Sequence, residues 1–271
     1  MAIKFFKYQG TGNDFIMIDD RDQGTFADMK PNAETVAYLC NRQFGVGADG
    51  LILLRESKEH DFTMVYFNSD GHEGSMCGNG GRCAVAFARH LGVVHTEASF
   101  MAVDGVHHAR ILAGDHKQLV ISLQINHVKV PDLQNQQMVL NTGSPHLVIF
   151  TDHISEMKVE EEGRMIRFSE DFADEGINVN FVEPLGNDTL FVRTYERGVE
   201  RETLSCGTGV TAAALGAWIR QIRNVGNMYN IKTPGGGLKV SFSPPANENG
   251  QFTGIWLTGP ASHVFEGEIT I

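Results

Sequence analysis

Two of the four cysteines, Cys77 and Cys206, stand in matching motifs with the residue types for acid–base chemistry. The first opens Cys77-Gly78-Asn79-Gly80 and the second Cys206-Gly207-Thr208-Gly209, and each precedes a run of small and apolar residues. A thiol in front of a helix lies where unpaired backbone N–H groups and the helix dipole stabilise negative charge. Glycine lets a ligand approach those N–H groups closely. Each motif therefore predicts a reactive thiol beside an anion pocket.

A thiolate and a thiol on opposite sides of one carbon have the chemistry to invert it. One removes a proton from the first face, and the other delivers a proton to the second. The carbanion's charge spreads into the substrate carboxylate, where the helix N-termini would stabilise it. We therefore predict a cofactor-independent amino-acid racemase or epimerase with Cys77 and Cys206 as its acid–base pair.

The cysteine motifs and their neighbours are also compatible with more ordinary roles. A lone cysteine before a glycine-rich turn is commonly a buried apolar residue, which is our interpretation of Cys40 and Cys83 in their apolar helical patterns. The segment 207–212 matches the dinucleotide fingerprint G-x-G-x-x-A, but no acidic residue follows about 20 positions later. The histidines lack metal-ligand spacing, and no C-x-x-C pair occurs. We expect neither a cofactor nor a metal.

The two motifs belong to a longer internal repeat. Tyr66 and Tyr195 each precede their cysteine by 11 positions. Two further pairs occur in the same order, Thr11-Gly12 with Thr142-Gly143 and Asp104-Gly105 with Gly235-Gly236. The repeat predicts two homologous halves, residues 1–123, completed by a C-terminal strand at 263–271, and residues 124–262.

The elements that must position the cysteines are mostly short strands. Segments rich in β-branched and aromatic residues predict strands at 62–67, 119–123 and 190–194. Helices are expected at 31–40 and 154–162, and after each cysteine at 83–91, before Gly92, and at 210–219. The last is apolar on every face, which predicts burial on every side. The fold class is therefore α+β: two homologous β-rolls, each a mostly antiparallel or mixed sheet around a central buried helix, with the active site in the cleft between them.

Composition narrows the possible partners. The 271 residues include 33 acidic and 22 basic side chains, a net charge of −11, which disfavours binding to nucleic acid or anionic membranes. The first residues do not resemble a signal peptide, and no apolar run approaches the roughly 20 residues that span a bilayer. We expect a cytoplasmic protein with a small-molecule amino-acid substrate.

Along nearly its whole length the chain resembles the diaminopimelate epimerase family. The segments that carry the resemblance are 10–15, 44–50, 67–71, 76–82, and 196–198 together with 206–209. The resemblance implies two α/β rolls with the active site between them and a chain that is often dimeric. It implies a cofactor-independent isomerase that converts LL-2,6-diaminopimelate to the meso form, in lysine and peptidoglycan precursor biosynthesis.

The resemblance also implies a role for each matching residue. Cys77 and Cys206 would be the acid–base pair, with His146 assisting. The amides offered to the reacting carboxylate would be those of Gly78, Asn79, Gly207 and Thr208. Asn13 and Glu196 would hold the polar groups near the reacting carbon. The distal amino and carboxylate groups would be bound by Asn68, Asn178 and Arg197.

Some of these residues have ordinary alternatives. Arg197 is a fixed cation that can hold a carboxylate bidentately, but it could instead form a surface salt bridge with Glu200 or Glu202. Glu196 could be a solvated strand residue and His146 a loop histidine. The three asparagines, Asn13, Asn68 and Asn178, are also common turn residues.

The chain departs from the family pattern at two positions. Ser144 stands where many members have asparagine, and Gly50 where some have glutamine. Both lie where the substrate's polar groups should be bound, so substrate recognition is less well defined than the chemistry.

Two rival functions stay open. Proline racemases and hydroxyproline epimerases share the fold, but they typically carry histidine where this chain has Asn79, and their substrates lack a distal acid for Arg197. A non-catalytic protein with a regulatory Cys77–Cys206 disulfide is the more distant alternative.

Overall fold

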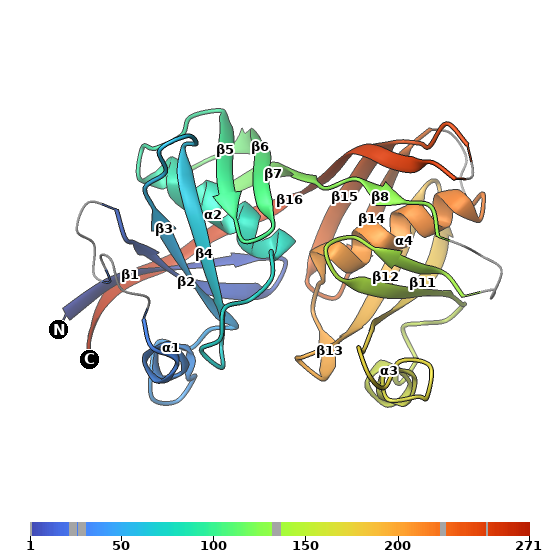
Figure 1. The fold of residues 1–271 in the computed structure, drawn as a ribbon, viewed down its shortest axis with the longest axis horizontal. Coiled ribbons are helices and arrows are strands. Elements are labelled where there is room, and N and C mark those ends of the chain that lie inside the picture. Colours follow the sequence, from blue (N-terminus) through green and yellow to red (C-terminus); the bar gives the residue numbers. More distant parts are fainter. Residues whose placement is uncertain (1, 22–25, 27–30, 132–136, 223–225, 248) are drawn as a thin grey trace. The chain divides into compact units, whose positions relative to one another are not determined.

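The computed structural model describes residues 2–21, 26, 31–131, 137–222, 226–247 and 249–271 (Figure 1). The chain divides into two compact units. The first consists of Met1–Leu123 and Gly259–Ile271, and the second of Gln124–Thr258. Within the described ranges, no helix is long and apolar enough to cross a membrane.

The first unit is a mixed sheet with one helix on each face. Its elements in chain order are β1 (Ala2–Gly10), β2 (Asn13–Asp19), α1 (Ala33–Cys40), β3 (Gly50–Arg55), β4 (Phe62–Asn68), α2 (Gly78–His90), β5 (Glu97–Ala102), β6 (Gly105–Gly114) and β7 (Gln118–Ile125). Strand β2 pairs with β3, and β4 with β5, in parallel, and the other neighbouring strands pair antiparallel.

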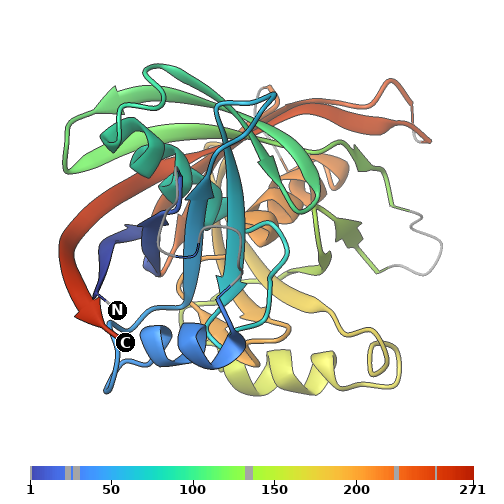
Figure 2. The same cartoon turned by 60° about the vertical axis from the view of Figure 1, so that its left-hand side comes forward.

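The last strand, β16 (Gln251–Thr270), closes this sheet around α2. It is hydrogen-bonded to both β7 and β1, and Ala2 pairs with Thr270, so the two chain ends lie side by side (Figures 1 and 2). Helix α2 packs on β1 to β4 and is buried from Gly78 through Ala88. Helix α1 contacts β3, and its Val36 and Leu39 join a core with Leu51 and Leu53.

The second unit repeats this plan. Its elements are β8 (Val128–Lys129), β9 (Val139–Asn141), β10 (Pro145–Phe150), α3 (Val159–Arg167), β11 (Asn178–Gly186), β12 (Thr189–Glu196), β13 (Arg201–Thr203), α4 (Gly207–Ile219), β14 (Met228–Thr233), β15 (Gly236–Ser243) and the first half of β16. Helix α4 packs on β9 to β12, β14 and β15, and α3 packs on β11, β12 and β13.

The order of parallel and antiparallel pairings is the same in both units. In each unit a β-hairpin is followed by α1 or α3 and then by a strand that pairs in parallel with the second strand of the hairpin. The next strand pairs antiparallel with that one, and after α2 or α4 a further strand pairs in parallel with it. Gly12 and Gly143 lie in equivalent hairpin turns, as do Gly105 and Gly236, and all four have positive φ angles. The predicted fold class of two rolls, each with a central buried helix, is confirmed.

One of the sequence echoes proved wrong in register. Ile52 and Asn180 occupy equivalent strand positions, since each faces the glycine three residues after its cysteine, Gly80 or Gly209. In the ladders, Ile52 pairs with Tyr66 and Asn180 with Thr194, so Tyr66 is equivalent to Thr194 rather than to Tyr195. Tyr195 instead packs in the core beneath α3. Successive strand residues point to opposite faces, so a slip of one position places the two tyrosines on different sides of their sheets.

The helix predicted at 154–162 was also misplaced. Helix α3 begins at Val159, and Ile154 lies in a turn before it. His153 has a φ of 59°, outside helical space, and the Ile154 backbone N–H donates to a carboxylate oxygen of Glu183. These two features keep the segment ahead of α3 out of the helix.

Two helical glycines differ in the space around them. A Cβ added at Gly163 of α3 would lie 2.4 Å from the Cβ of Tyr195, whereas one at Gly216 of α4 would meet its nearest neighbours at 3.4 Å. We expect Gly163→Ala to lower the free energy of unfolding by about 1–3 kcal/mol through overpacking. Gly216→Ala is the matched control and should be neutral or stabilise by up to about 1 kcal/mol. Urea unfolding measures both, and equal midpoints for the two variants would refute this account of α3 packing.

Candidate active site

Cys77 and Cys206 occupy the same backbone position in their units, the N-cap of the central helix. Both residues are extended, with φ and ψ of −106° and 119° at Cys77 and −113° and 113° at Cys206. Each sulfur accepts a backbone N–H three residues on, from Gly80 at 3.5 Å and from Gly209 at 3.4 Å. Each thiol therefore sits where a helix start favours negative charge.

In the first unit, an acceptor oxygen faces Cys77. The Cys77 Sγ lies 3.6 Å from Asn13 Oδ1, and Asn79 Nδ2 donates to the same oxygen at 3.4 Å. The Asn13 amide cannot be reversed, because its Nδ2 donates to the Asp49 carboxylate at 2.8 Å. Asn13 therefore presents a fixed acceptor to the thiol.

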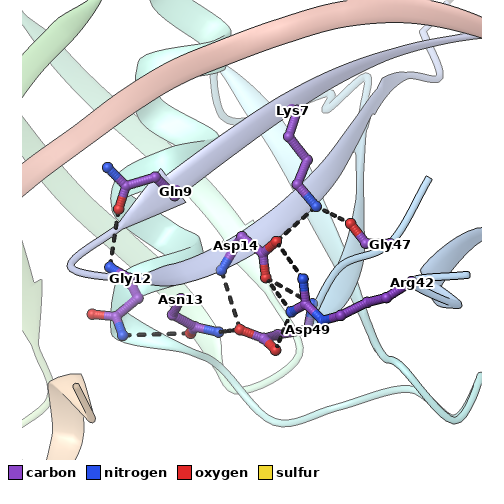
Figure 3. A network of polar contacts seen from close by, with 9 residues as sticks. Lys7, Gln9, Gly12, Asn13, Asp14, Arg42, Gly47 and Asp49 are labelled. Atoms are coloured by element: carbon purple, nitrogen blue, oxygen red, sulfur yellow. Dashed lines mark hydrogen bonds and ion pairs between the residues drawn. The ribbon is translucent and has the colours of Figure 1, made fainter. Parts of the chain in front are cut away.

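A cluster of charged side chains, Lys7, Asp14, Arg42 and Asp49, holds Asn13 through its Asp49 carboxylate (Figure 3). Arg42 bridges the carboxylates of Asp14 and Asp49, at 2.8 and 2.9 Å, and Lys7 pairs with Asp14 at 2.8 Å. Although burial acts to raise the pKa of Asp14, hydrogen bonds from Arg42 and Lys7 hold it well below its ordinary value. The cluster keeps the Asp14 carboxylate ionised, and Arg42 links it to Asp49, the acceptor that holds Asn13.

Arg82 fixes the Asn79 amide from the other side. Its fully buried guanidinium donates to Asn79 Oδ1 at 3.0 Å and to Thr11 Oγ1 at 3.3 Å. It also donates to the carbonyl oxygens of Gly78 and Pro260. With its oxygen held by Arg82, Asn79 must turn Nδ2 toward Asn13. The orientations of both amides therefore follow from the charged groups that flank them, Arg82 beside Asn79 and Asp49 beside Asn13.

In the second unit, a hydroxyl faces Cys206. Thr208 Oγ1 lies 3.4 Å from Cys206 Sγ and 2.9 Å from His146 Nε2. On the other side of the ring, Asn180 Nδ2 lies 3.1 Å from His146 Nδ1. Burial lowers the pKa of His146 to about 3, and the positive charge of Arg197 acts in the same direction, so the ring is neutral.

Ser144 connects His146 to Asn178. Ser144 Oγ lies 3.1 Å from His146 Nε2 and accepts a hydrogen bond from Asn178 Nδ2 at 3.1 Å. Asn178 Oδ1 in turn accepts the backbone N–H of Arg197 at 2.9 Å. In this structure the buried Asn178 amide therefore ties the turn at Arg197 to the β9–β10 loop.

The alternative salt bridges for Arg197 do not form. Glu200 pairs with Arg167, and Glu202 with Arg193 at 2.6 Å. The Arg197 side chain is exposed and donates to the carbonyl oxygen of Glu175 at 2.7 Å. Its neighbour Glu196 ends β12 and accepts a hydrogen bond from the Thr203 hydroxyl.

Asn68 stands at the exposed end of β4, opposite Gly50 in the ladder. A Cβ at Gly50 would lie 2.5 Å from the ring of Tyr66, and one at Gly74 would lie 2.5 Å from the same ring. The two glycines therefore make room for Tyr66. The departure at Gly50 has a physical reason, because a glutamine there would collide with this tyrosine.

The two remaining cysteines are structural, as predicted. Cys40 ends α1 and Cys83 lies within α2, and both are buried. Burial raises the pKa of each thiol to about 12. Neither sulfur forms a thiolate near neutral pH.

Three residues around the cysteines, Asp49, Arg82 and Asn180, were assigned no role from the sequence. Asp49 and Arg82 lie within the motifs that carried the resemblance, but no role was given to either. Asn180 had a detectable signal, since it alternates with Asn178 at the start of a strand that continues with apolar Phe181 and Val182. Two polar residues on one face of a buried strand indicate a polar partner.

Comparison with known proteins supports the resemblance. The family model described as diaminopimelate epimerase matches residues 5–124 and 138–264. Diaminopimelate epimerase from Flavobacterium psychrophilum is 49% identical over 267 residues, covering 98% of this chain and 100% of the relative. That from Aquifex aeolicus is 38% identical over 282 residues, covering 99% and 98%.

Solved structures of lower identity share the fold. A phenazine biosynthesis protein of the PhzF family from Bacillus anthracis has a TM-score of 0.75 at 14% identity, and the match covers 100% of both chains. A probable proline racemase from Agrobacterium radiobacter has a TM-score of 0.74 at 13% identity, over 99% of this chain and 93% of its own. The fold is thus shared by proteins with different names, so the fold alone does not identify the family. The sequence matches do identify it: this chain belongs to the diaminopimelate epimerase family.

Proposed function

We propose that this protein inverts one α-carbon of LL-2,6-diaminopimelate to give meso-diaminopimelate, in lysine and peptidoglycan precursor biosynthesis. Cys77 and Cys206 act as acid and base on opposite faces of that carbon. The observation that carries the proposal is the shared position of both thiols at the N-cap of a buried central helix, each accepting a glycine N–H. The proposal requires neither a cofactor nor a metal.

The surroundings of the two sulfurs favour different starting protonation states. Cys77 faces the fixed acceptor Asn13 Oδ1, to which only a thiol can donate. Each sulfur accepts a glycine N–H, but Cys206 also lies 3.4 Å from the Thr208 hydroxyl, a group that can donate to it. In the proposed free enzyme Cys77 is therefore the thiol and Cys206 the thiolate, and the two states exchange with each inversion.

The helix starts supply the groups that would stabilise the carbanion. The backbone N–H groups of Gly78 and Asn79, and of Gly207 and Thr208, are in the first turns of α2 and α4, where N–H groups point toward the N-terminal end of the helix. In the proposal they donate to the reacting carboxylate, where negative charge accumulates as the α-proton leaves.

Substrate recognition rests on residues near the ends of β4, β11 and β12. In the proposal, Arg197 pairs with the distal carboxylate, and Asn68 and Asn178 contact the distal amino and carboxylate groups. Glu196 and Asn13 hold the polar groups near the reacting carbon, and His146 assists Cys206. The exposure of Arg197, together with its freedom from Glu200 and Glu202, supports its role.

The proposal also locates the enzyme in the cytoplasm. All four cysteines are free, and the mechanism requires Cys77 and Cys206 to stay reduced. A homodimer stays a prediction from the family resemblance.

The direct test is conversion of LL-diaminopimelate by the purified, chelator-treated protein, with the meso form followed by chiral chromatography. Cys77→Ser and Cys206→Ser should each lower this conversion by about 10²–10⁴-fold, because serine is a poor acid and base near neutral pH. Each single variant should still exchange the α-proton of one stereoisomer, since one thiol remains.

Cys40→Ala and Cys83→Ala are the matched controls and should keep wild-type turnover, because both thiols are buried away from this chemistry. Full activity in Cys77→Ser, or loss of activity in Cys40→Ala alone, would contradict the assignment of the acid–base pair. An inactive wild-type protein would contradict the proposed substrate.

Replacing Arg197 tests the distal carboxylate. Arg197→Met leaves a substrate anion without its cation, which should cost about 1.5–3 kcal/mol, or roughly 10- to 150-fold in kcat/KM. Arg201→Met, at an exposed position on the adjacent β13, should behave as wild type. If the two variants gave the same kcat/KM, Arg197 would not bind the distal carboxylate.

A further inference from the structure

Asn180 is a buried polar residue beneath the start of α4, and no role was predicted for it from the sequence. It lies in β11 with no exposed surface. A Cβ at Gly209 would lie 2.3 Å from Asn180 Oδ1, so the amide fits under the helix start only because residue 209 is glycine. The equivalent contact in the first unit is apolar, since Gly80 faces the Cδ1 of Ile52. The two units therefore differ directly beneath their cysteine-led helices.

The orientation of the Asn180 amide is fixed by two neighbours. Its Nδ2 lies 3.1 Å from the carbonyl oxygen of Leu147, which can only accept. Its Oδ1 accepts the hydroxyl of Thr194 at 3.0 Å. Reversing the amide would place two oxygens against each other at Leu147, so Nδ2 must also be the group that faces His146.

This orientation determines the tautomer of His146. Nδ1 of the ring receives the second hydrogen of Asn180 Nδ2, so Nδ1 carries no proton. A neutral imidazole then holds its single proton on Nε2. Nε2 lies 2.9 Å from Thr208 Oγ1 and 3.1 Å from Ser144 Oγ, and both oxygens can accept.

We propose that Asn180 is a positioning residue that sets the direction of this hydrogen-bond chain: by donating to His146 Nδ1 it places the ring proton on Nε2 and leaves the Thr208 hydroxyl free to donate to the Cys206 sulfur. With the opposite tautomer, Nε2 would accept the Thr208 hydrogen, and Cys206 would lose that donor. The inference rests on the proposed function only for its catalytic consequence, because the tautomer itself is a property of the folded protein.

Among the described charged groups, Arg197 acts on the ring, and its positive charge disfavours a protonated His146. Its side-chain hydrogen bond goes to the Glu175 carbonyl oxygen rather than to Nδ1, so it does not select between the two neutral tautomers. Asn180 is the residue placed to do so.

The test is the ¹⁵N NMR spectrum of protein labelled at histidine nitrogens, with His146→Gln used to identify the His146 signals. The wild type should show a proton on Nε2. Asn180→Asp offers an acceptor in place of the donor and should move the proton to Nδ1, and the apolar Asn180→Leu should give a mixture of tautomers. Thr194→Val is the control, because it removes only the bond to Asn180 Oδ1 and should keep the wild-type tautomer.

Kinetics supply the second readout. Asn180→Asp should shift the acidic limb of the pH profile of kcat/KM upward by about one to two pH units, because the Cys206 thiolate loses the Thr208 hydrogen bond. Thr208→Val should lower kcat/KM in the wild-type background and change it little in the Asn180→Asp background. A purely structural Asn180 would lower stability and leave both the profile and this non-additivity unaltered.

The failures are distinguishable. A wild-type proton on Nδ1, or an Nε2 proton retained in both Asn180 variants, would overturn the role of Asn180 whatever the substrate is. An enzyme inactive on diaminopimelate but with the expected tautomers would overturn the proposed function and leave the hydrogen-bond chain standing.

Discussion

The structure depends on one interaction that occurs twice: a cysteine sulfur that caps a buried helix by accepting a backbone N–H three residues on. The central helix fits inside its roll because its first turn is glycine-rich and alanine is frequent in the residues that follow. Burial removes water from the helix N-terminus, which makes the N–H groups of its first turn stronger partners for an anion. The same constraint that allows the roll to close around its helix therefore also prepares the thiol and the carboxylate site.

The two units keep this backbone arrangement and differ in the groups around it. Around Cys77 the chain of amides runs between a buried arginine, Arg82, and the carboxylate of Asp49, and it ends on an acceptor. Around Cys206 the neutral His146 and the Thr208 hydroxyl replace it, and the hydrogen-bonded series ends on a hydroxyl that can donate to the sulfur. A duplicated fold supplies two equivalent thiols, and the divergence of their neighbours gives each thiol a different set of hydrogen-bond partners.

The sequence allowed the prediction of a buried helix after each cysteine, although the expected ranges begin at 83 and 210 and the helices begin at Gly78 and Gly207. It also allowed the prediction of the paired turns at Gly12 and Gly143, whose positive φ angles need glycine. Three features could not be predicted. The start of α3 depends on a positive φ at His153, a residue that does not signal one, and the register of Tyr66 depends on strand pairing. The contact of Asn180 with His146, 34 positions away in the sequence, depends on the parallel register of β10 with β11, in which His146 pairs with Asn178.

The central claim is that two different thiols exchange protons with opposite faces of one carbon. The most direct measurement is the conversion of LL-diaminopimelate in heavy water, stopped at low conversion and analysed by mass spectrometry. The account predicts that the meso product carries one solvent deuterium at the inverted carbon, while the remaining LL substrate carries none, because the delivering thiol is in exchange with solvent. A meso product that retained the substrate's own hydrogen would show that a single group returns the proton it removed, and would contradict the account.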